Sequence, residues 1–289
     1  MVHGQFSGTS KPFEAEDVVG RGISRSGVGR EGVSGGTGVP YALPPADPMP
    51  ASPSSAPSPG TPPSGAPFAS AVLVAAGRST RMGGATRKPA ILLAGRSVLE
   101  RTLDAFRAAG TVAQIVVGVH ADDLDDWRAR LADDIVLVAG GAERTDSVRA
   151  GVNVATSEVV LVHDAARCLV RPERLDQVAQ AARADGAALL AVPVRDTLHR
   201  ASEGRAVEVV EREDLWAAQT PQAFRTNLLR SHLERAATDG WTPTDDAALH
   251  ERYAGPVTLV SGDPDNLKLT TPADVALFEA LLAARGNEA

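Results

Sequence analysis

The stretch from residue 71 to residue 84 reads AVLVAAGRSTRMGG, a short apolar run followed by a loop rich in glycine and arginine. An apolar run that ends at turn residues predicts a buried strand, here Ala71–Ala75. The loop after it would lie at the carboxyl end of that strand, where open α/β sheets bind their ligands. It matches neither the dinucleotide pattern G-x-G-x-x-G nor the P-loop pattern. Its small residues allow backbone N–H groups to approach a phosphate, and Arg81 and Lys88 add two cations.

Further apolar runs follow along the chain and alternate with helical patterns. Beside Ala71–Ala75, the predicted strands are Ile115–Val119, Ile135–Val138, Val159–Val162, Ala188–Val194 and Val257–Val260. Because these runs are apolar throughout, they favour strands that are covered by helices on both faces. Two helices have clear start signals, a capping box at Ser97–Glu100 and the segment Thr271–Asp274 with proline at the first position. The βαβα order predicts a doubly wound, mostly parallel α/β sheet.

One polar segment, residues 196–214, interrupts this order. It contains the turn sequence Ser202-Glu203-Gly204, and three valines follow within six residues of that turn. The pattern predicts a β-hairpin that protrudes as an arm. The arm could pack on its own subunit or be exchanged between two subunits, and the sequence favours neither.

The first 70 residues differ in composition from the rest, since Gly, Pro and Ser make up half of them. Such a segment cannot bury enough apolar surface to offset the entropy of ordering, so we expect a disordered tail over residues 1–70. The folded domain is then expected over residues 71–285. Met49 is a candidate start of translation, and a chain that began there would lack most of this tail.

Composition also limits the compartment and the partners. The net charge is −7 and basic residues do not cluster, which argues against binding to nucleic acid or to a membrane surface. A single cysteine, Cys168, cannot form an internal disulfide and indicates a reducing compartment. Neither a signal peptide nor a long apolar segment is evident. We therefore expect a soluble, cytoplasmic protein.

The loop pattern A-A-G-x-x-x-R-M with a lysine downstream resembles that of nucleotidyltransferases that act on sugar or polyol phosphates. Six later segments, in order, narrow the resemblance: Gly140–Val148, Val162–Arg167, Pro193–Thr197, Leu215–Gln222, Thr244–Asp245 and Asp265–Lys268. Over about residues 71–285 the chain closely resembles the 2-C-methyl-D-erythritol 4-phosphate cytidylyltransferases of the non-mevalonate isoprenoid pathway. The resemblance implies a nucleotidyltransferase fold of the glycosyltransferase A-like type.

The resemblance also implies the substrates and the site. CTP would be bound by Ala75, Ala76, Gly77, Gly141, Ser147 and Ala165, and the catalytic cations would be Arg81, Lys88, Arg212 and Lys268. The acceptor, methylerythritol phosphate, would contact Asp164, Arg167, Thr197, Thr220 and Thr244. Mg²⁺ would be the cofactor, with Asp164 near it directly or through water. The arm would join two subunits into a homodimer, with Arg212 at the partner's pocket.

Some alternatives stay open at this point. The chain has Arg87-Lys88-Pro89 where the family usually has Pro-Lys-Gln, Ala142 at a position that is often acidic, and Cys168 where proline is usual. These departures affect the shape of the loops more than the chemistry. The protein could instead act on another acceptor such as ribitol 5-phosphate, or be a molybdopterin-type transferase with a similar loop, although Arg212, Thr220 and Lys268 together favour methylerythritol phosphate. A non-catalytic nucleotide-binding regulator is the alternative from another class.

Overall fold

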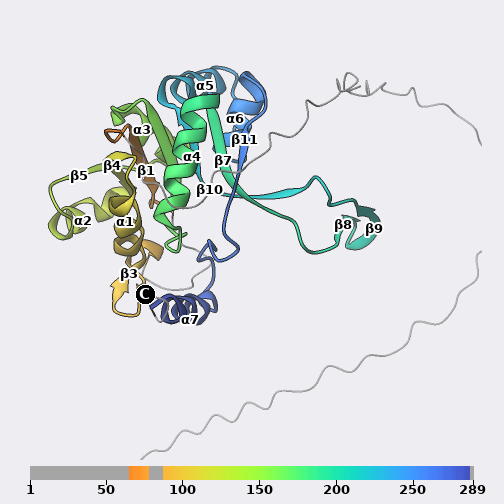
Figure 1. Ribbon diagram of the computed structural model, residues 1–289, viewed down its shortest axis with the longest axis horizontal. Helices are drawn as coiled ribbons and strands as arrows, with labels where there is room; N and C mark the ends of the chain where they lie inside the picture. Colours follow the sequence, from red (N-terminus) through yellow and green to blue (C-terminus); the bar gives the residue numbers. More distant parts are fainter. Residues whose placement is uncertain (1–64, 78–86, 287–289) are drawn as a thin grey trace, which may run out of the picture. The chain divides into compact units, whose positions relative to one another are not determined.

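Seven strands form the central sheet, in the order β11-β7-β10-β6-β1-β4-β5 (Figure 1). The computed structural model describes residues 65–77 and 87–286, which belong to one compact unit. The strands are β1 (Ala69–Val74), β4 (Val112–Val119), β5 (Ile135–Ala139), β6 (Val159–Asp164), β7 (Ala187–Pro193), β10 (Trp216–Arg225) and β11 (Thr258–Ser261). All are parallel except β10, which is antiparallel to both of its neighbours, β6 and β7.

The predicted strands are all present, with ends that differ by up to three residues. The sequence did not predict β10, because Pro221 lies in the middle of it and proline argues against an interior strand. The pairing of β10 with β7 shifts register between Ala218 and Gln222, and this irregularity accommodates the proline. The mostly parallel sheet is thus confirmed, with one antiparallel strand inserted into it.

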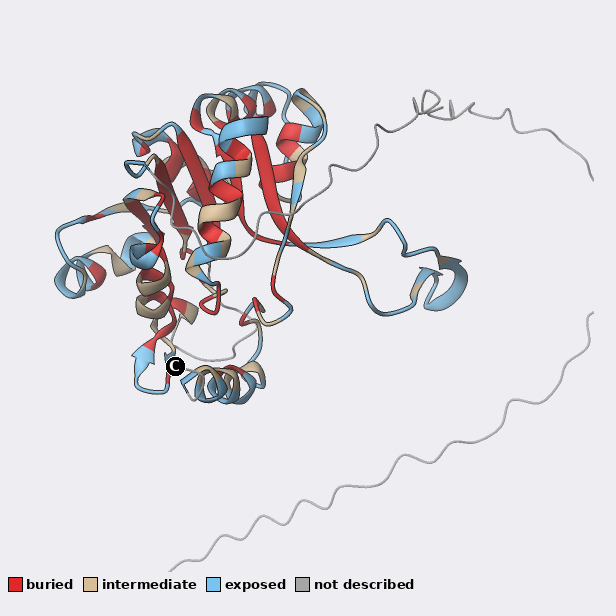
Figure 2. Ribbon diagram, in the orientation of Figure 1, coloured by how far each residue is buried: buried red, intermediate tan, exposed pale blue. Residues whose placement is uncertain are grey.

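Helices cover both faces of the sheet. On one face lie α1 (Val98–Ala108), α2 (Leu124–Arg130) and α4 (Pro172–Asp185), and on the other lie α3 (Arg144–Val154), α5 (Thr226–Thr238) and α6 (Asp246–Tyr253). Successive β1 residues point to opposite sides, so that Leu73 packs in the α1–α4 core and Val72 in the α3–α5 core. Figure 2 shows the strands buried between these layers. The doubly wound fold is therefore confirmed.

The two predicted helix starts have different outcomes. At α1 the Glu100 N–H donates to Ser97 Oγ at 3.2 Å and the Ser97 N–H donates to the Glu100 carboxylate at 2.8 Å, which confirms the capping box. At the other end of the chain, α7 (Asp274–Gly286) begins two residues later than the predicted first helical residue, Pro272. The Asp274 carboxylate accepts hydrogen bonds from the N–H groups of Thr270 and Thr271, which holds the preceding turn outside the helix.

The predicted hairpin is formed by β8 (Leu198–Ser202) and β9 (Arg205–Val210), which pair antiparallel with each other. Its two turn residues both have positive φ, 48° at Glu203 and 76° at Gly204. Positive φ at both central residues is typical of the type I′ turn, whose twist matches that of a hairpin. The hairpin extends away from the sheet (Figure 1) and is exposed along its length (Figure 2).

Most of the predicted tail, residues 1–64, lies outside the described residues, and β1 already begins at Ala69. Four short elements complete the described chain: η2 (Lys88–Ala90), β2 (Leu92–Leu93), β3 (Arg96–Ser97) and η3 (Ala121–Asp123). Within residues 65–77 and 87–286 no helix is long and apolar enough to span a bilayer.

Candidate active site

A cavity of about 540 Å³ opens at the carboxyl ends of β1, β4, β5 and β6. From β1 the chain passes to β4 and β5 on one side, and it then returns to β6 on the other side. This reversal of strand order is the point where doubly wound sheets leave a crevice for ligands. The cavity is lined by the residues that follow each of these strands, including Gly77, His120, Gly140 and Ala165.

The β5 side of the pocket requires glycine. A Cβ atom at Gly140 would lie 2.2 Å from the Ala76 Cβ and 2.8 Å from the Ser147 Oγ, so that only glycine fits. The Ser147 hydroxyl accepts a hydrogen bond from the Gly141 N–H at 3.1 Å, which fixes this loop at the start of α3. Bare backbone next to a small side chain leaves room for a flat ring. The six residues predicted to bind CTP all line this cavity: Ala75, Ala76, Gly77, Gly141, Ser147 and Ala165.

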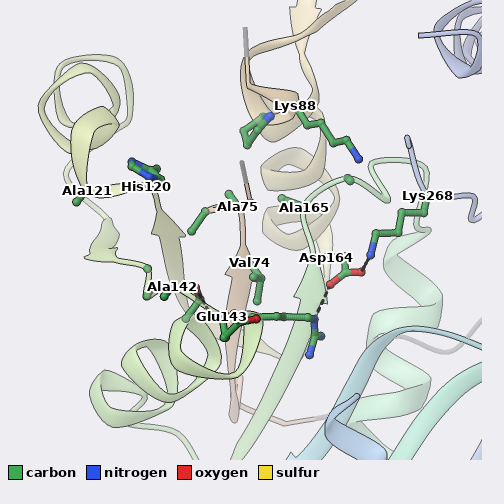
Figure 3. Close-up of a pocket in the computed structure, with 18 residues that line it drawn as sticks. Val74, Ala75, Lys88, His120, Ala121, Ala142, Glu143, Asp164, Ala165 and Lys268 are labelled. Carbon is green, nitrogen blue, oxygen red and sulfur yellow. Dashed lines mark hydrogen bonds and ion pairs between the residues drawn. The ribbon is translucent and has the colours of Figure 1, made fainter. Parts of the chain in front are cut away.

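Asp164, the last residue of β6, lies between two cations (Figure 3). Its Oδ1 is 3.1 Å from Arg144 Nε and its Oδ2 is 2.6 Å from Lys268 Nζ. Burial acts to raise the pKa of Asp164, but the two cations outweigh burial and hold that pKa well below its usual range. The carboxylate therefore stays ionised, and it brings the predicted residue Lys268 to the cavity.

Arg144 was not predicted as a site residue, although it lies in one of the segments on which the resemblance rests. It is the first residue of α3, and its guanidinium donates to Asp164 and also, at 2.8 Å, to Asp246 Oδ2. Asp246 is 1% exposed and begins α6. Beyond the motif that contains Arg144, the sequence signal for this pair was the position of each residue at the start of a helix that follows a glycine-rich or polar loop.

His163 and Thr220 hold Asp164 in place through a chain of hydrogen bonds. The His163 Nε2 faces the carbonyl oxygen of Arg167 at 3.2 Å, so Nε2 must hold the proton, and Nδ1 then accepts from the Thr220 hydroxyl at 3.1 Å. Thr220 Oγ1 in turn accepts from the Asp164 N–H at 3.1 Å. Burial lowers the pKa of the fully buried His163 to about 3, which keeps the ring neutral. His163 therefore supports the packing at the end of β6.

The other predicted acceptor residues do not line the cavity of the described chain. Arg167 Nη1 donates to the Asn266 carbonyl at 2.8 Å, and Thr220 uses its hydroxyl within the chain of bonds above. Thr197 precedes the hairpin and Thr244 precedes α6, and both are exposed. The Arg212 guanidinium donates to the carbonyl of Arg195, at the base of its own hairpin. Their contact with an acceptor stays a prediction.

Of the predicted pair of phosphate-binding cations, Lys88 lines the cavity and Arg81 lies outside the described residues. Lys88 opens η2, directly after Arg87, one of the departures from the family pattern. The Arg87 guanidinium pairs with Asp122 at 3.2 Å and with Asp123, both on η3. The second departure, Ala142, lines the cavity, and burial raises the pKa of Cys168, the third, to about 11.

The described part of the chain has no group of three or more His, Cys, Asp or Glu side chains that could hold a metal ion. Two carboxylates line the cavity, Glu143 and Asp164, and Asp164 already forms ion pairs with two cations. This set does not form a metal cage. It fits an ion that takes most of its ligands from phosphate oxygens and water, as Mg²⁺ commonly does.

Comparison with known proteins identifies the family of this chain. The model of the 2-C-methyl-D-erythritol 4-phosphate cytidylyltransferase family matches residues 69–284. The chain belongs to this family. The match covers the two outer strands of the sheet and every residue that lines the cavity.

Curated members and solved structures of the cytidylyltransferase family agree with this assignment. The family member from Bacillus velezensis is 42% identical over 223 residues, which are 75% of this chain and 96% of that protein. The one from Thermosynechococcus vestitus is 41% identical over 225 residues, 75% of this chain and 96% of the relative. The crystal structure of 2-C-methyl-D-erythritol 4-phosphate cytidylyltransferase from Thermus thermophilus is similar with a TM-score of 0.63 and 35% identity, covering 73% of this chain and 98% of the other. The 4-diphosphocytidyl-2C-methyl-D-erythritol synthase of Anaerococcus prevotii gives a TM-score of 0.67 at 29% identity, over 75% and 96%.

Proposed function

We propose that this chain transfers CMP from CTP to 2-C-methyl-D-erythritol 4-phosphate, giving 4-diphosphocytidyl-2-C-methyl-D-erythritol and pyrophosphate for isoprenoid biosynthesis. The observation that supports this function most directly is the cavity at the place where the strand order reverses. There Lys88, Asp164 and Lys268 meet a glycine-lined wall in a chain of the cytidylyltransferase family.

In the proposed reaction a phosphate oxygen of the acceptor attacks the α-phosphorus of CTP. One O–P bond forms, the bond from that phosphorus to the bridging oxygen breaks, and pyrophosphate leaves with the electron pair. The nucleophile is already anionic and needs no general base, so the protein contributes position and charge. Lys88, together with Arg81, stabilises the negative charge that develops on the phosphate oxygens in the transition state.

On the acceptor side we propose that Lys268 and Arg212 hold the acceptor's phosphate. Lys268 is 40% exposed and its ammonium lies at the cavity, so an incoming phosphate can reach it without rearrangement of the backbone. Asp164 offers its carboxylate to acceptor hydroxyls, and Arg167, Thr197, Thr220 and Thr244 are the other proposed contacts of the acceptor. The orientation that these contacts impose aligns the attacking oxygen with the bond that breaks.

Mg²⁺ is the proposed cofactor. When bound, it would neutralise triphosphate charge and assist the departure of pyrophosphate. Of the residues that line the cavity, Asp164 would hold it, directly or through water, with phosphate oxygens as the other ligands. Its removal by EDTA is expected to abolish turnover, and its return to restore it.

We further propose a homodimer joined by the β8–β9 hairpin, and a cytoplasmic location. The hairpin strands pair with each other, and Val207 and Val209 on one of them are more than half exposed, which suits a partner surface. The only cysteine of the chain, Cys168, is buried and unpaired, as is common in reducing compartments.

The reaction is tested by pyrophosphate release from the full chain with CTP and Mg²⁺. Parallel reactions contain methylerythritol phosphate, ribitol 5-phosphate or no acceptor. Release that depends on methylerythritol phosphate is the expected result. Release with ribitol 5-phosphate alone would change the acceptor, and CTP binding without release in any reaction would favour a non-catalytic regulator.

A further inference from the structure

Asp246 is a buried carboxylate that the proposed reaction does not use directly. It is 1% exposed, does not line the cavity, and contacts Arg144 Nη2 through its Oδ2 at 2.8 Å. A buried carboxylate without a cation is costly, so the pair with Arg144 is a requirement of this packing. That requirement also fixes where the guanidinium lies.

The guanidinium of Arg144 joins two carboxylates. Its Nη2 donates to Asp246 and its Nε donates to Asp164 at 3.1 Å. Because the guanidinium is planar and rigid, fixing one of its nitrogens fixes the direction of the others. The line of charges continues from Asp164 Oδ2 to Lys268 Nζ, so alternating charges connect Asp246 to the cavity.

Hydrogen bonds also hold Asp246, the first member of this line of charges, in place. Asp245 caps α6 by accepting from the Ala248 N–H at 3.0 Å, and its other oxygen accepts from Gln222 Nε2 at 2.8 Å. The Gln222 amide oxygen accepts from the Ala247 N–H at 2.8 Å, which ties the first turn of α6 to β10. The backbone of Asp246 is thus held on both sides by hydrogen bonds to the sheet and to its own helix.

We propose that Asp246 is a positioning residue for the transfer reaction, which holds Arg144 so that Asp164 and Lys268 keep their places in the cavity. The inference rests on the proposed function. Without Asp246, the Arg144 guanidinium would be free to turn toward the anionic triphosphate, and Asp164 would lose its fixed partner. The nucleotide would still bind, but the acceptor phosphate would be misaligned.

The test compares the full-length wild type with Asp246→Asn, Arg144→Gln and the double variant. For each protein, kcat, both KM values and the melting temperature are measured. We expect Asp246→Asn to lower kcat about 10- to 100-fold, since small misplacements near a reacting centre have effects of this size. The KM for CTP should change by less than about threefold. The double variant should be no slower than Arg144→Gln, since both substitutions break the same contact between Arg144 and Asp246.

A matched control removes a carboxylate that supports structure only. Asp176 accepts from the N–H groups of Gly110 and Thr111 at the start of β4, at the end of that strand opposite to the cavity. Asp176→Asn is expected to lower the melting temperature and leave kcat within about twofold of the wild type. If Asp246→Asn does not fold, Arg144→Lys decides, because a lysine keeps the charge but cannot hold both carboxylates in a fixed fork.

Two results would overturn the inference while the wild type is active. One is a kcat of Asp246→Asn, or of Arg144→Lys where that variant decides, equal to the wild-type value. The other is a double variant in which the two losses in kcat multiply, as they do for independent sites. A wild type that is folded and inactive with every acceptor would instead overturn the proposed function, and this inference with it.

Discussion

Lys88 is the described member of the predicted pair of cations for the triphosphate, and its ammonium lies at the cavity (Figure 3). Preplaced cations act mainly on the transition state, where charge has moved onto the phosphate oxygens. We therefore expect Lys88→Met to lower kcat about 100- to 1,000-fold and to raise the KM for CTP by a smaller factor. Steady-state kinetics with CTP and methylerythritol phosphate measure both.

The control for Lys88→Met is Arg96→Met, which removes a cation from an exposed ion pair with Asp104 on the β3–α1 segment. This control should leave both kinetic constants unchanged. Equal activity of Lys88→Met and the wild type would remove Lys88 from the proposed mechanism.

Single residues also mark the limit of what the sequence could predict about the site. Lys88, Asp164 and Lys268 were predicted, because each lies in a motif with a recognisable family pattern, and the structure brings all three to one cavity. Arg144 also lies in such a motif, but its role was not predicted, because its contact with Asp246 joins residues 102 positions apart and no local pattern encodes such a pair. Long-range ion pairs depend on how the helices pack, which a single sequence does not state.

Among the elements, η2 and η3 are joined by the ion pairs of Arg87, the residue that precedes η2. This guanidinium, 26% exposed, pairs with Asp122 and Asp123, and it immediately precedes Lys88. Arg87 stands where the family pattern has proline, and its ion pairs tie the chain next to Lys88 to η3, whose first residue, Ala121, also lines the cavity. We expect Arg87→Ala to raise the KM for CTP about twofold to fivefold, as befits a partly exposed ion pair.

Arg87→Ala is compared with Arg96→Ala, whose ion pair is exposed and lies outside the cavity lining. If Asp122 and Asp123 are the partners that matter, replacing both by asparagine should raise the KM for CTP as much as Arg87→Ala does. An unchanged KM in both variants would show that the connection between η2 and η3 does not affect Lys88.

Helices α5 and α6 meet at two buried histidines, and this junction predicts a dependence of stability on pH. His232 Nε2 lies 3.3 Å from His250 Nδ1, and both rings are shielded from water. Burial, together with the neighbouring His250 and Arg235, lowers the pKa of His232 to about 4. The unfolded chain thus binds more protons than the folded one between about pH 4 and 6.5, so stability is complete above this window and is lost as the pH falls through it.

Chemical unfolding at pH 7.5, 5.5 and 4.5 measures this effect. The free energy of unfolding of the wild type should fall over this range, and that of His232→Gln should fall less steeply. His199→Gln, on the exposed hairpin, is the control and should follow the wild type. Identical pH dependence in all three proteins would show that His232 does not titrate on unfolding.

At the scale of the whole molecule, the layered architecture could be predicted from the periodicity of the sequence. The order of the strands in the sheet could not. Apolar runs predicted six strands, since burial on both faces leaves a strong signal. The insertion of β10 between β6 and β7 could not be predicted, because its sequence contains Pro221 and polar residues and its pairing depends on distant partners. That insertion matters for the site, because β10 places Thr220 beneath Asp164.

The β8–β9 hairpin raises the question of whether one chain forms a complete site. Arg212, at the base of the hairpin, donates to the carbonyl of Arg195 and does not line the cavity of its own chain. If the hairpin is exchanged in a homodimer, Arg212 acts in the partner's cavity. A mixture of Arg212→Ala and Lys88→Met chains would then contain dimers with one intact site, because each variant supplies what the other lacks.

We expect each variant alone to be inactive and the mixture, after dissociation and reassociation, to recover about one quarter of the wild-type activity, the fraction of intact sites under random pairing. Light scattering verifies that the mixed chains are dimers, and replacement of residues 198–210 by a short glycine linker should give monomers. Mixed dimers without activity would place Arg212 in the site of its own chain, or outside the reaction. A fully active monomer would show that the cavity of one chain is sufficient, because transfer would then proceed with no residue from a second copy.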